Sequence, residues 1–93
     1  MAHPVDVYVG NQIRRLRLAQ GITQIKLAEQ IGVKFQQLQK YETAANRISA
    51  SRLYEVAQAL GGDIHTFFPT PDAISTLAED LNLEGQTLSG PES

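Results

Sequence analysis

Cysteine is absent from this sequence, and so are long runs of apolar residues. Without cysteine the chain can form neither disulfides nor thiolate metal sites, and its 2 histidines are too far apart in sequence to make a ligand cluster. No stretch of about eighteen apolar residues could span a membrane, and the N-terminus lacks the basic and apolar regions of a signal peptide. We therefore expect a cytoplasmic protein with no membrane contact, no metal and no cofactor.

Positive charge is missing from the last third of the chain. Residues 1–60 hold all 8 Lys and Arg with 4 of the 10 Asp and Glu, a formal charge of +4, whereas residues 61–93 hold the remaining 6 acids, a formal charge of −6. The net charge of −2 therefore conceals a basic first part. A surface in that part is suited to the phosphates of a nucleic acid.

Motifs for catalysis are lacking as well. The sequence contains no nucleophile with a base at a plausible spacing, no glycine-rich phosphate loop and no paired carboxylates. His65, beside Phe67 and Phe68, is more simply a packing or surface residue than a catalyst. A chain of 93 residues fits one small domain with a modest core. We expect a protein that is not an enzyme.

The sequence does contain a helix-turn-helix pattern in residues 23–42. Apolar residues recur at helical spacing on both sides of Gly32: Leu27, Ala28, Ile31, Leu38 and Tyr41. Glycine can adopt the left-handed conformation that ends a helix, and the small apolar Val33 can tuck beneath the helix pair. Thr23 is suited to cap the first of these helices. The second helix then turns amide side chains outward, and such a surface can read base edges.

The same spacing predicts an all-α fold. We expect a first helix from Asp6 to the turn at Gly21, and two helices on either side of Gly32, the second of them over residues 34–42. A fourth helix runs from Ser49 to Leu60, a fifth over residues 63–68, and a sixth at about 71–82. Residues 1–69 form the domain with its five helices, and residues 70–93 add a C-terminal helix and a tail. Residues 84–93 have too little apolar content to pack, so we expect that tail to be disordered.

An ordered set of residues between Val9 and Phe68 resembles the helix-turn-helix domain of the lambdoid repressor and Cro proteins and the XRE family of bacterial transcriptional regulators. The matching residues are Arg17, Gly21, Thr23-Gln24, Leu27-Ala28, Ile31-Gly32-Val33, Leu38 and Tyr41-Glu42. The resemblance implies a five-helix repressor-like domain that binds double-stranded DNA as a homodimer, with repression the commoner behaviour. It also implies an ion pair between Arg17 and Glu42. We expect no small-molecule effector.

In that geometry the helix over residues 34–42 lies in the major groove with its N-terminal end deepest. The Gln36 amide can then form a bidentate pair with adenine, and Lys40 can donate to guanine. Phe35 contacts a thymine methyl or folds back onto the core. Gln37, ranked above Gln39, reaches a base or a phosphate, or is simply an exposed helix former. The predicted base-reading residues are therefore Phe35, Gln36, Gln37 and Lys40.

The predicted phosphate contacts come from other places. Gln24 stands at a helix N-terminus, where amide donors and the helix dipole suit a phosphate oxygen, although a plain solvent-facing glutamine is the simpler interpretation. The resemblance implies backbone contacts in the loop after residue 42, where Asn46 and the cationic Arg47 are candidates. Gln39 completes this group.

Lys34 and Ala44 are among the residues that depart from the family's pattern; Ile25 and Gly62 are the others. Lys34 stands where a Ser, Thr or Asp cap usually opens the recognition helix, at a cost of about 1 kcal/mol. Ala44 stands where a glycine is common. Either Ala44 is strained in a positive-φ conformation or the loop has another shape.

Two questions remain open at this level. The outward face of Phe35, Gln36 and Gln37 could instead bind a protein, which would make the chain an interaction adaptor or an antitoxin-type partner. Steep salt dependence of binding would favour DNA. The apolar stripe of Ile74, Leu77 and Leu81, together with Phe67 and Phe68, either joins two copies or completes the core of one.

Overall fold

The computed structural model describes residues 2–73 and residue 75, and in this part of the chain every regular element is helical. The elements are α1 (Pro4–Ala19), α2 (Gln24–Ile31), α3 (Phe35–Glu42), α4 (Ala50–Leu60) and the 3-10 helix η1 (Ile64–Phe67). The prediction of an all-α domain with five helices is confirmed for the described residues.

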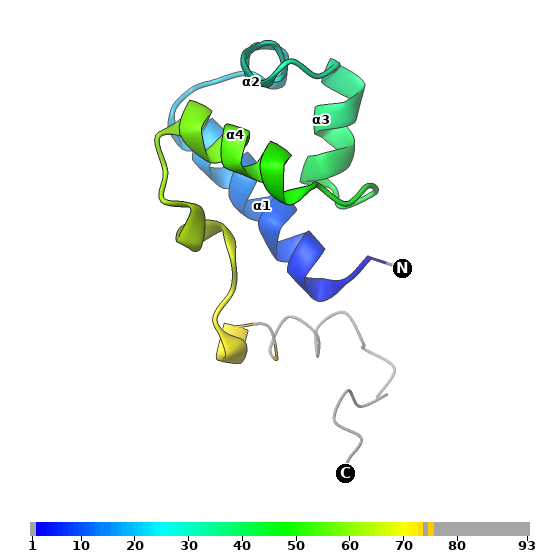
Figure 1. Ribbon diagram of the computed structural model, residues 1–93, viewed down its shortest axis with the longest axis vertical. Helices are drawn as coiled ribbons and strands as arrows, with labels where there is room; N and C mark the ends of the chain where they lie inside the picture. Colours follow the sequence, from blue (N-terminus) through cyan, green and yellow to red (C-terminus); the bar gives the residue numbers. More distant parts are fainter. Residues whose placement is uncertain (1, 74, 76–93) are drawn as a thin grey trace.

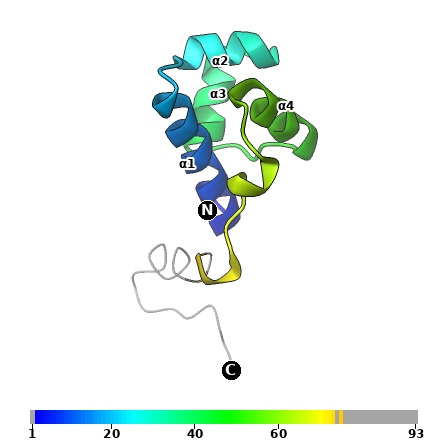
Figure 2. The same cartoon turned by 90° about the vertical axis from the view of Figure 1, so that its left-hand side faces the viewer.

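Helices α2 and α3 meet at one end of the molecule (Figures 1 and 2). Helix α1 runs from the N-terminus towards that end, and α4 lies across α1. Helix α3 packs against both α1 and α2, and α4 packs against α2 and α1. The 3-10 helix η1 returns to contact α1 and α4. This arrangement leaves one side of α3 uncovered.

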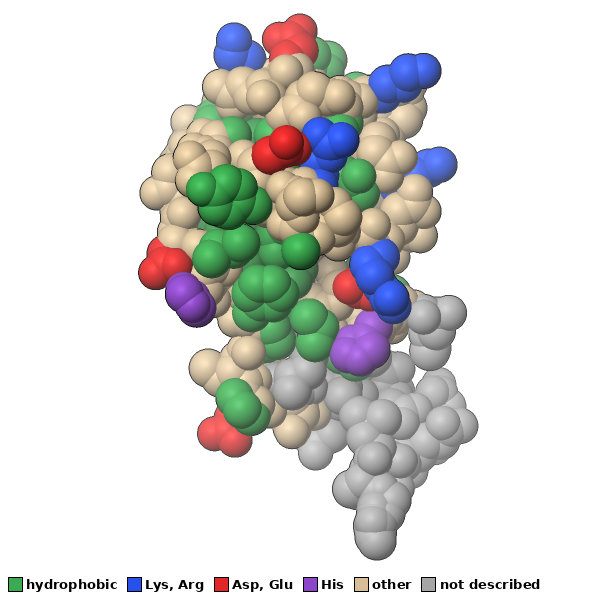
Figure 3. Space-filling model, in the orientation of Figure 1, with side chains coloured by type: hydrophobic (Ala, Val, Ile, Leu, Met, Phe, Trp, Pro, Cys, Tyr) green, Lys and Arg blue, Asp and Glu red, His purple; other side chains and the backbone are tan. Residues whose placement is uncertain are grey.

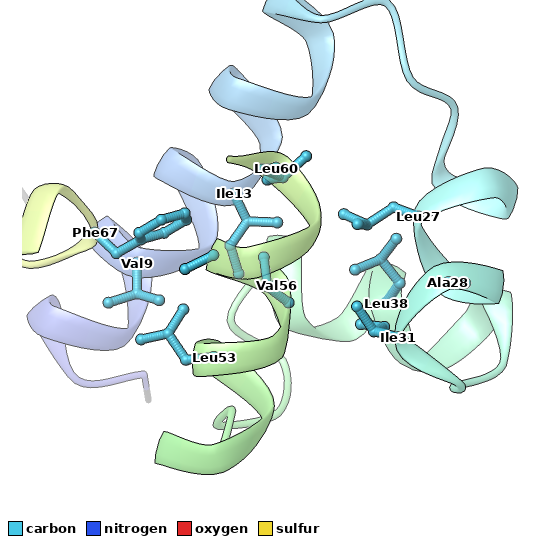
Figure 4. Close-up of a cluster of buried hydrophobic side chains, with 11 residues drawn as sticks. Val9, Ile13, Leu27, Ala28, Ile31, Leu38, Leu53, Val56, Leu60 and Phe67 are labelled. Atoms are coloured by element: carbon cyan, nitrogen blue, oxygen red, sulfur yellow. The ribbon is translucent and has the colours of Figure 1, made fainter. Parts of the chain in front are cut away.

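A single hydrophobic core joins all five elements (Figure 4). Its buried members are Val9, Ile13, Leu27, Ala28, Ile31, Leu38, Leu53, Val56, Ala57, Leu60 and Phe67. Phe67 is fully buried, so for this residue the structure agrees with the second of the two alternatives, completion of the core of one copy. The reason is that η1 folds back and inserts this ring between α1 and α4. Phe68, the next residue, remains 47% exposed.

Local capping defines most helix ends. The hydroxyls of Thr23 and Ser49 accept the backbone N–H groups of Lys26 and Arg52, both at 3.1 Å. Gly32 has a φ of 75° and ends α2 in the left-handed conformation, as predicted. The N-cap of α3 is Lys34, whose side chain makes no capping hydrogen bond, so α3 begins without the stabilisation that opens α2 and α4.

The first and fifth helices differ from the prediction. Helix α1 begins at Pro4 rather than Asp6, because the ring of His3 accepts the N–H of Val5 at 3.0 Å and proline suits the first helical turn. The fifth element is a 3-10 helix whose N-cap is Asp63. Both differences are of about one or two residues, within the usual variation of helix ends.

Only the start of the predicted C-terminal helix lies within the described residues. The hydroxyl of Thr70 accepts the N–H of Ala73 at 3.1 Å, and residues 71–73 and 75 are helical. Ile74, Leu77, Leu81 and the tail over residues 84–93 lie outside the described residues, so that part of the prediction stays a prediction. Among the helices of residues 2–73, none combines the length and the apolar character needed to cross a membrane.

Helices α1 and α3 approach each other at Gly10, which is buried. A Cβ atom added at Gly10 would lie 2.5 Å from the carbonyl oxygen of Tyr41 and 2.7 Å from that of Glu42. Only a residue without a side chain allows this separation. The contact sets the position of the C-terminal end of α3 against α1.

Candidate nucleic-acid interface

A buried ion pair holds the C-terminal end of α3. The Nε atom of Arg17 donates to Oε2 of Glu42 at 2.7 Å, and Nη2 donates to Oε1 at 3.1 Å. The two side chains are 7% and 1% exposed. A bidentate pair of this kind fixes orientation as well as charge. The pair implied by the resemblance is thus present, and it joins α1 to α3.

Two further hydrogen bonds extend this pair to the start of α2. Arg17 Nη1 donates to the carbonyl oxygen of Ile22 at 2.9 Å, and Gln24 Nε2 donates to Oε1 of Glu42 at 2.9 Å. The Glu42 carboxylate therefore receives three hydrogen bonds where it is buried. Gln24 is half-buried, and its side-chain nitrogen is used within the protein.

The uncovered side of α3 carries polar side chains. Gln36, Gln39 and Lys40 are exposed, whereas Phe35 and Gln37 are half-buried. Part of the Phe35 ring is therefore accessible, and the two alternatives for this residue stay open. The exposed set can donate and accept hydrogen bonds along one face of the helix.

A shallow depression lies beside this face of α3. Its lining consists of Arg14, Gln24, Gln36, Gln39, Lys40, Glu42 and Thr43. The structure thus brings together four of the predicted DNA-contacting residues, from α2 and α3. It adds Arg14 from α1, which the sequence interpretation missed. A signal existed, because Arg14 precedes Arg17 by three residues and so lies on nearly the same side of α1.

The loop after α3 holds the other two predicted phosphate contacts, which do not line this depression. Asn46 is exposed, and its backbone N–H donates to the carbonyl oxygen of Lys40 at 3.1 Å. Arg47 Nε donates to Oδ2 of Asp6 at 3.0 Å, and the Arg47 side chain is 75% exposed. Ala44 has a φ of 62°, so the loop does have the conformation that favours glycine.

The described residues contain no group of three or more His, Cys, Asp or Glu side chains that could hold a metal ion. At the N-cap of η1, hydrogen bonds from the backbone N–H and then the ring of His65 lower the pKa of Asp63 below 3.8. This exposed carboxylate belongs to the N-cap residue of η1, and it does not line the depression beside α3.

Comparison with known proteins places this geometry in a family. A family model described as Helix-turn-helix (HTH_3) matches residues 13–67. The chain belongs to this helix-turn-helix family, of the XRE type. A relative from Rhodospirillum rubrum, described as an uncharacterized transcriptional regulator in the ATPase CF(0) region, is 54% identical over 66 residues. That match covers 71% of this chain and 61% of the relative.

Solved helix-turn-helix regulators share the fold. The clp gene regulator ClgR from Corynebacterium glutamicum aligns with a TM-score of 0.70 at 25% identity, over 85% of this chain and 82% of its own. The biofilm regulator SinR, solved in complex with DNA, aligns with a TM-score of 0.60 at 28% identity, over 63% of this chain and 95% of its own. The chain spans about half to three fifths of the curated relatives it matches, from 48% to 61% for two of them.

Proposed function

We propose that this helix-turn-helix protein is a sequence-specific DNA-binding transcriptional regulator that acts as a repressor and reads the major groove with α3. The observation that carries the proposal is the uncovered face of α3, where Gln36, Gln39 and Lys40 are exposed beside a depression whose acid, Glu42, is buried and paired. Amides and an ammonium on a rigidly held helix are suited to base edges, and the absence of exposed acid there favours an approach to DNA.

Different side chains of α3 contact different bases. Gln36 pairs with adenine through its amide, and Lys40 donates to guanine. The accessible part of the Phe35 ring contacts a thymine methyl, and Gln37 flanks it. Because the α3 end is held by Arg17 and Glu42, these side chains keep a fixed register relative to the rest of the domain.

Phosphate contacts position the domain without reading sequence. Gln39 and Arg47 provide side-chain donors, and Asn46 lies beside Arg47 in the loop. The side-chain nitrogen of Gln24 is held by Glu42, so the contact at the start of α2 falls mainly to backbone N–H groups at the helix N-terminus. The proposal implies action in the cytoplasm, beside the bacterial chromosome, without cofactor or small-molecule effector.

A homodimer is part of the proposal. One recognition helix reads only a few base pairs, so useful specificity requires two half-sites about one helical turn apart. Hydrophobic side chains gather on the face of the molecule that carries α4 (Figure 3). The exposed apolar residues of the described chain include Tyr54, 56% exposed, and Phe68. Such a surface supports association with a second copy.

The test is a titration with duplex DNA at several salt concentrations, using the site selected from a random pool as the cognate sequence. Gln36→Ala should cost about 1–3 kcal/mol on the cognate site and little on random DNA. Arg47→Ala should weaken binding to both and reduce the salt slope by about one. Gln30→Ala is the matched control, because Gln30 is also exposed but lies on α2 and does not line the depression beside α3.

The competing function is a protein-binding adaptor built on the same fold. Salt-independent binding, or equal losses on cognate and random DNA for Gln36→Ala, would contradict the proposed reading by α3. Retained affinity for a protein ligand through Phe35, Gln36 and Gln37 would then support the adaptor.

A further inference from the structure

The depression beside α3 carries unbalanced positive charge. Arg14 from α1 and Lys40 from α3 are exposed cations on its lining. Its one acidic residue, Glu42, has 1% of its side chain exposed and is already bound by Arg17 and Gln24. An anion entering the depression would therefore meet two cations and no free carboxylate.

Arg14 differs from the other four arginines of the chain. Arg15, Arg17, Arg47 and Arg52 each donate to a protein acceptor. Arg14 makes no hydrogen bond or ion pair with any other described residue. All five of its N–H donors are thus available in a planar arrangement that matches two oxygens of a phosphate.

We propose that Arg14 binds a phosphate of the DNA backbone seated in this depression, which makes α1 a third DNA-contacting helix. The inference rests on the proposed function and deepens it. Arg14 lies on α1 and Lys40 on α3, and both line the depression, so Arg14 can reach a phosphate at the edge of the major groove when α3 lies inside the groove. The edge of the groove is formed by phosphates, which carry no sequence information.

Arg15 provides a matched control on the same helix. It has the same charge and is also exposed, but its Nη1 donates to Oε1 of Gln12 at 3.0 Å, and it lines a separate depression with Leu16 and Leu18. Comparing Arg14→Ala with Arg15→Ala therefore separates a direct phosphate contact from the general effect of removing one positive charge from α1.

The experiment is a duplex titration of the full chain and its variants between about 50 and 200 mM salt. Arg14→Ala should weaken binding about five- to ten-fold on cognate and random duplexes alike and should lower the salt slope by about one. Arg14→Lys should keep the slope, and Arg15→Ala should change neither affinity nor slope. Circular dichroism and thermal unfolding should be unchanged in Arg14→Ala, because Arg14 is exposed and has no partner among the described residues.

The negative results of this experiment distinguish failure of the Arg14 assignment from failure of the proposed function. Equal losses for Arg14→Ala and Arg15→Ala would reduce the role of Arg14 to long-range attraction, and a loss confined to the cognate site would make it a base reader. Either result overturns the phosphate assignment. If the unmodified chain binds DNA and Gln36→Ala is impaired while Arg14→Ala binds normally, only this inference fails. If the unmodified chain shows no salt-dependent DNA binding, the proposed function fails with it.

Discussion

Arg17 and Glu42 are the two buried charged residues in the described part of the chain. Removing two charges from water costs several kcal/mol for each, and the bidentate pair with its added hydrogen bonds offsets that cost. The pair therefore contributes modestly to net stability. Its main effect is to fix the orientation of α3, because either charge left alone would be buried without compensation.

We therefore expect Arg17→Ala and Glu42→Ala each to lower the free energy of unfolding by about 3–5 kcal/mol. Glu55→Ala is the control, since Glu55 pairs with Arg52 at 2.8 Å on an exposed surface and should cost under about 1 kcal/mol. Urea denaturation of the three variants measures the difference. Two near-neutral variants at Arg17 and Glu42 would show that the pair does not matter for folding.

Ala44 stores local backbone strain. An L-residue with Cβ pays about 1–2 kcal/mol in the left-handed region, whereas glycine does not. Glycine has more freedom in the unfolded chain, which costs about 0.4–1 kcal/mol, so Ala44→Gly should raise the free energy of unfolding by about 0.5–1 kcal/mol. The same change at Ala45, whose φ is not positive, should instead destabilise. Chemical denaturation of both variants checks the sign, and destabilisation by Ala44→Gly would contradict the assigned strain.

Asp63 links the stability of η1 to pH. The backbone N–H of His65, and then its ring, hold the pKa of Asp63 below 3.8 in the folded chain. A depressed folded pKa means that the ionised form stabilises the fold above the unfolded pKa of about 3.9, and that this contribution is lost as the pH falls through the folded value.

An NMR titration of the Asp63 carboxyl should therefore give a pKa below the usual value of an aspartate. In His65→Ala the pKa should rise but stay depressed, because the backbone N–H remains. A pKa at or above the usual value in the unmodified chain would exclude the capping interaction in solution.

At the scale of elements, the contact between α1 and α3 depends on Gly10. The atoms that a Cβ would meet are backbone carbonyls of α3, which cannot turn away as a flexible side chain could. With a side chain at position 10, α1 must therefore move away from α3. That movement must also change the distances between the side chains of Arg17 and Glu42. The close contact thus couples the packing of α1 to the position of α3.

Gly10→Ala should accordingly destabilise the protein by about 2 kcal/mol or more, even though alanine gains about 1 kcal/mol in helix propensity. Gly62→Ala is the comparison, because its added Cβ would meet Phe67 at an ordinary 3.5 Å and its φ is not positive. That variant should be close to neutral. Thermal unfolding of both variants measures the difference in stability. If Gly10→Ala is as stable as Gly62→Ala, α1 can move away from α3 without loss of stability.

At the scale of the whole molecule, the described core lies between Val9 and Phe67. Removing residues 70–93 therefore removes none of these core residues. If this segment joins two copies, truncation after Pro69 should convert a dimer into a monomer and weaken binding to the cognate site. Sedimentation and DNA titration of the truncated chain measure both properties.

A truncated chain that stays dimeric with unchanged affinity would exclude the C-terminal segment as the dimerisation element. Exposed apolar residues of the described chain, among them Tyr54 on α4, would then be the candidates for the interface. Tyr54→Ser in the truncated chain would test it, since loss of the dimer would place the interface on α4.

Local interactions explain why the sequence predicted the helix-turn-helix so closely. Thr23 and Ser49 each cap an N–H group three residues away, and Gly32 needs only its own backbone freedom to end α2. Helical spacing likewise placed Leu27 and Leu38 inside. These interactions span a few residues, so they can be inferred without knowing how the helices pack.

The sequence by itself therefore determined the helix-turn-helix, the caps at Thr23 and Ser49, and the face of α3 that is turned outward. Only the tertiary structure decided which distant groups meet: Gly10 against α3, Arg47 on Asp6, Phe67 within the core, and Arg14 with Lys40 in the lining of one depression. Such contacts join segments tens of residues apart, and they depend on the distances and angles between packed helices. A sequence pattern records which face of a helix is buried, but it does not record the neighbour that covers it.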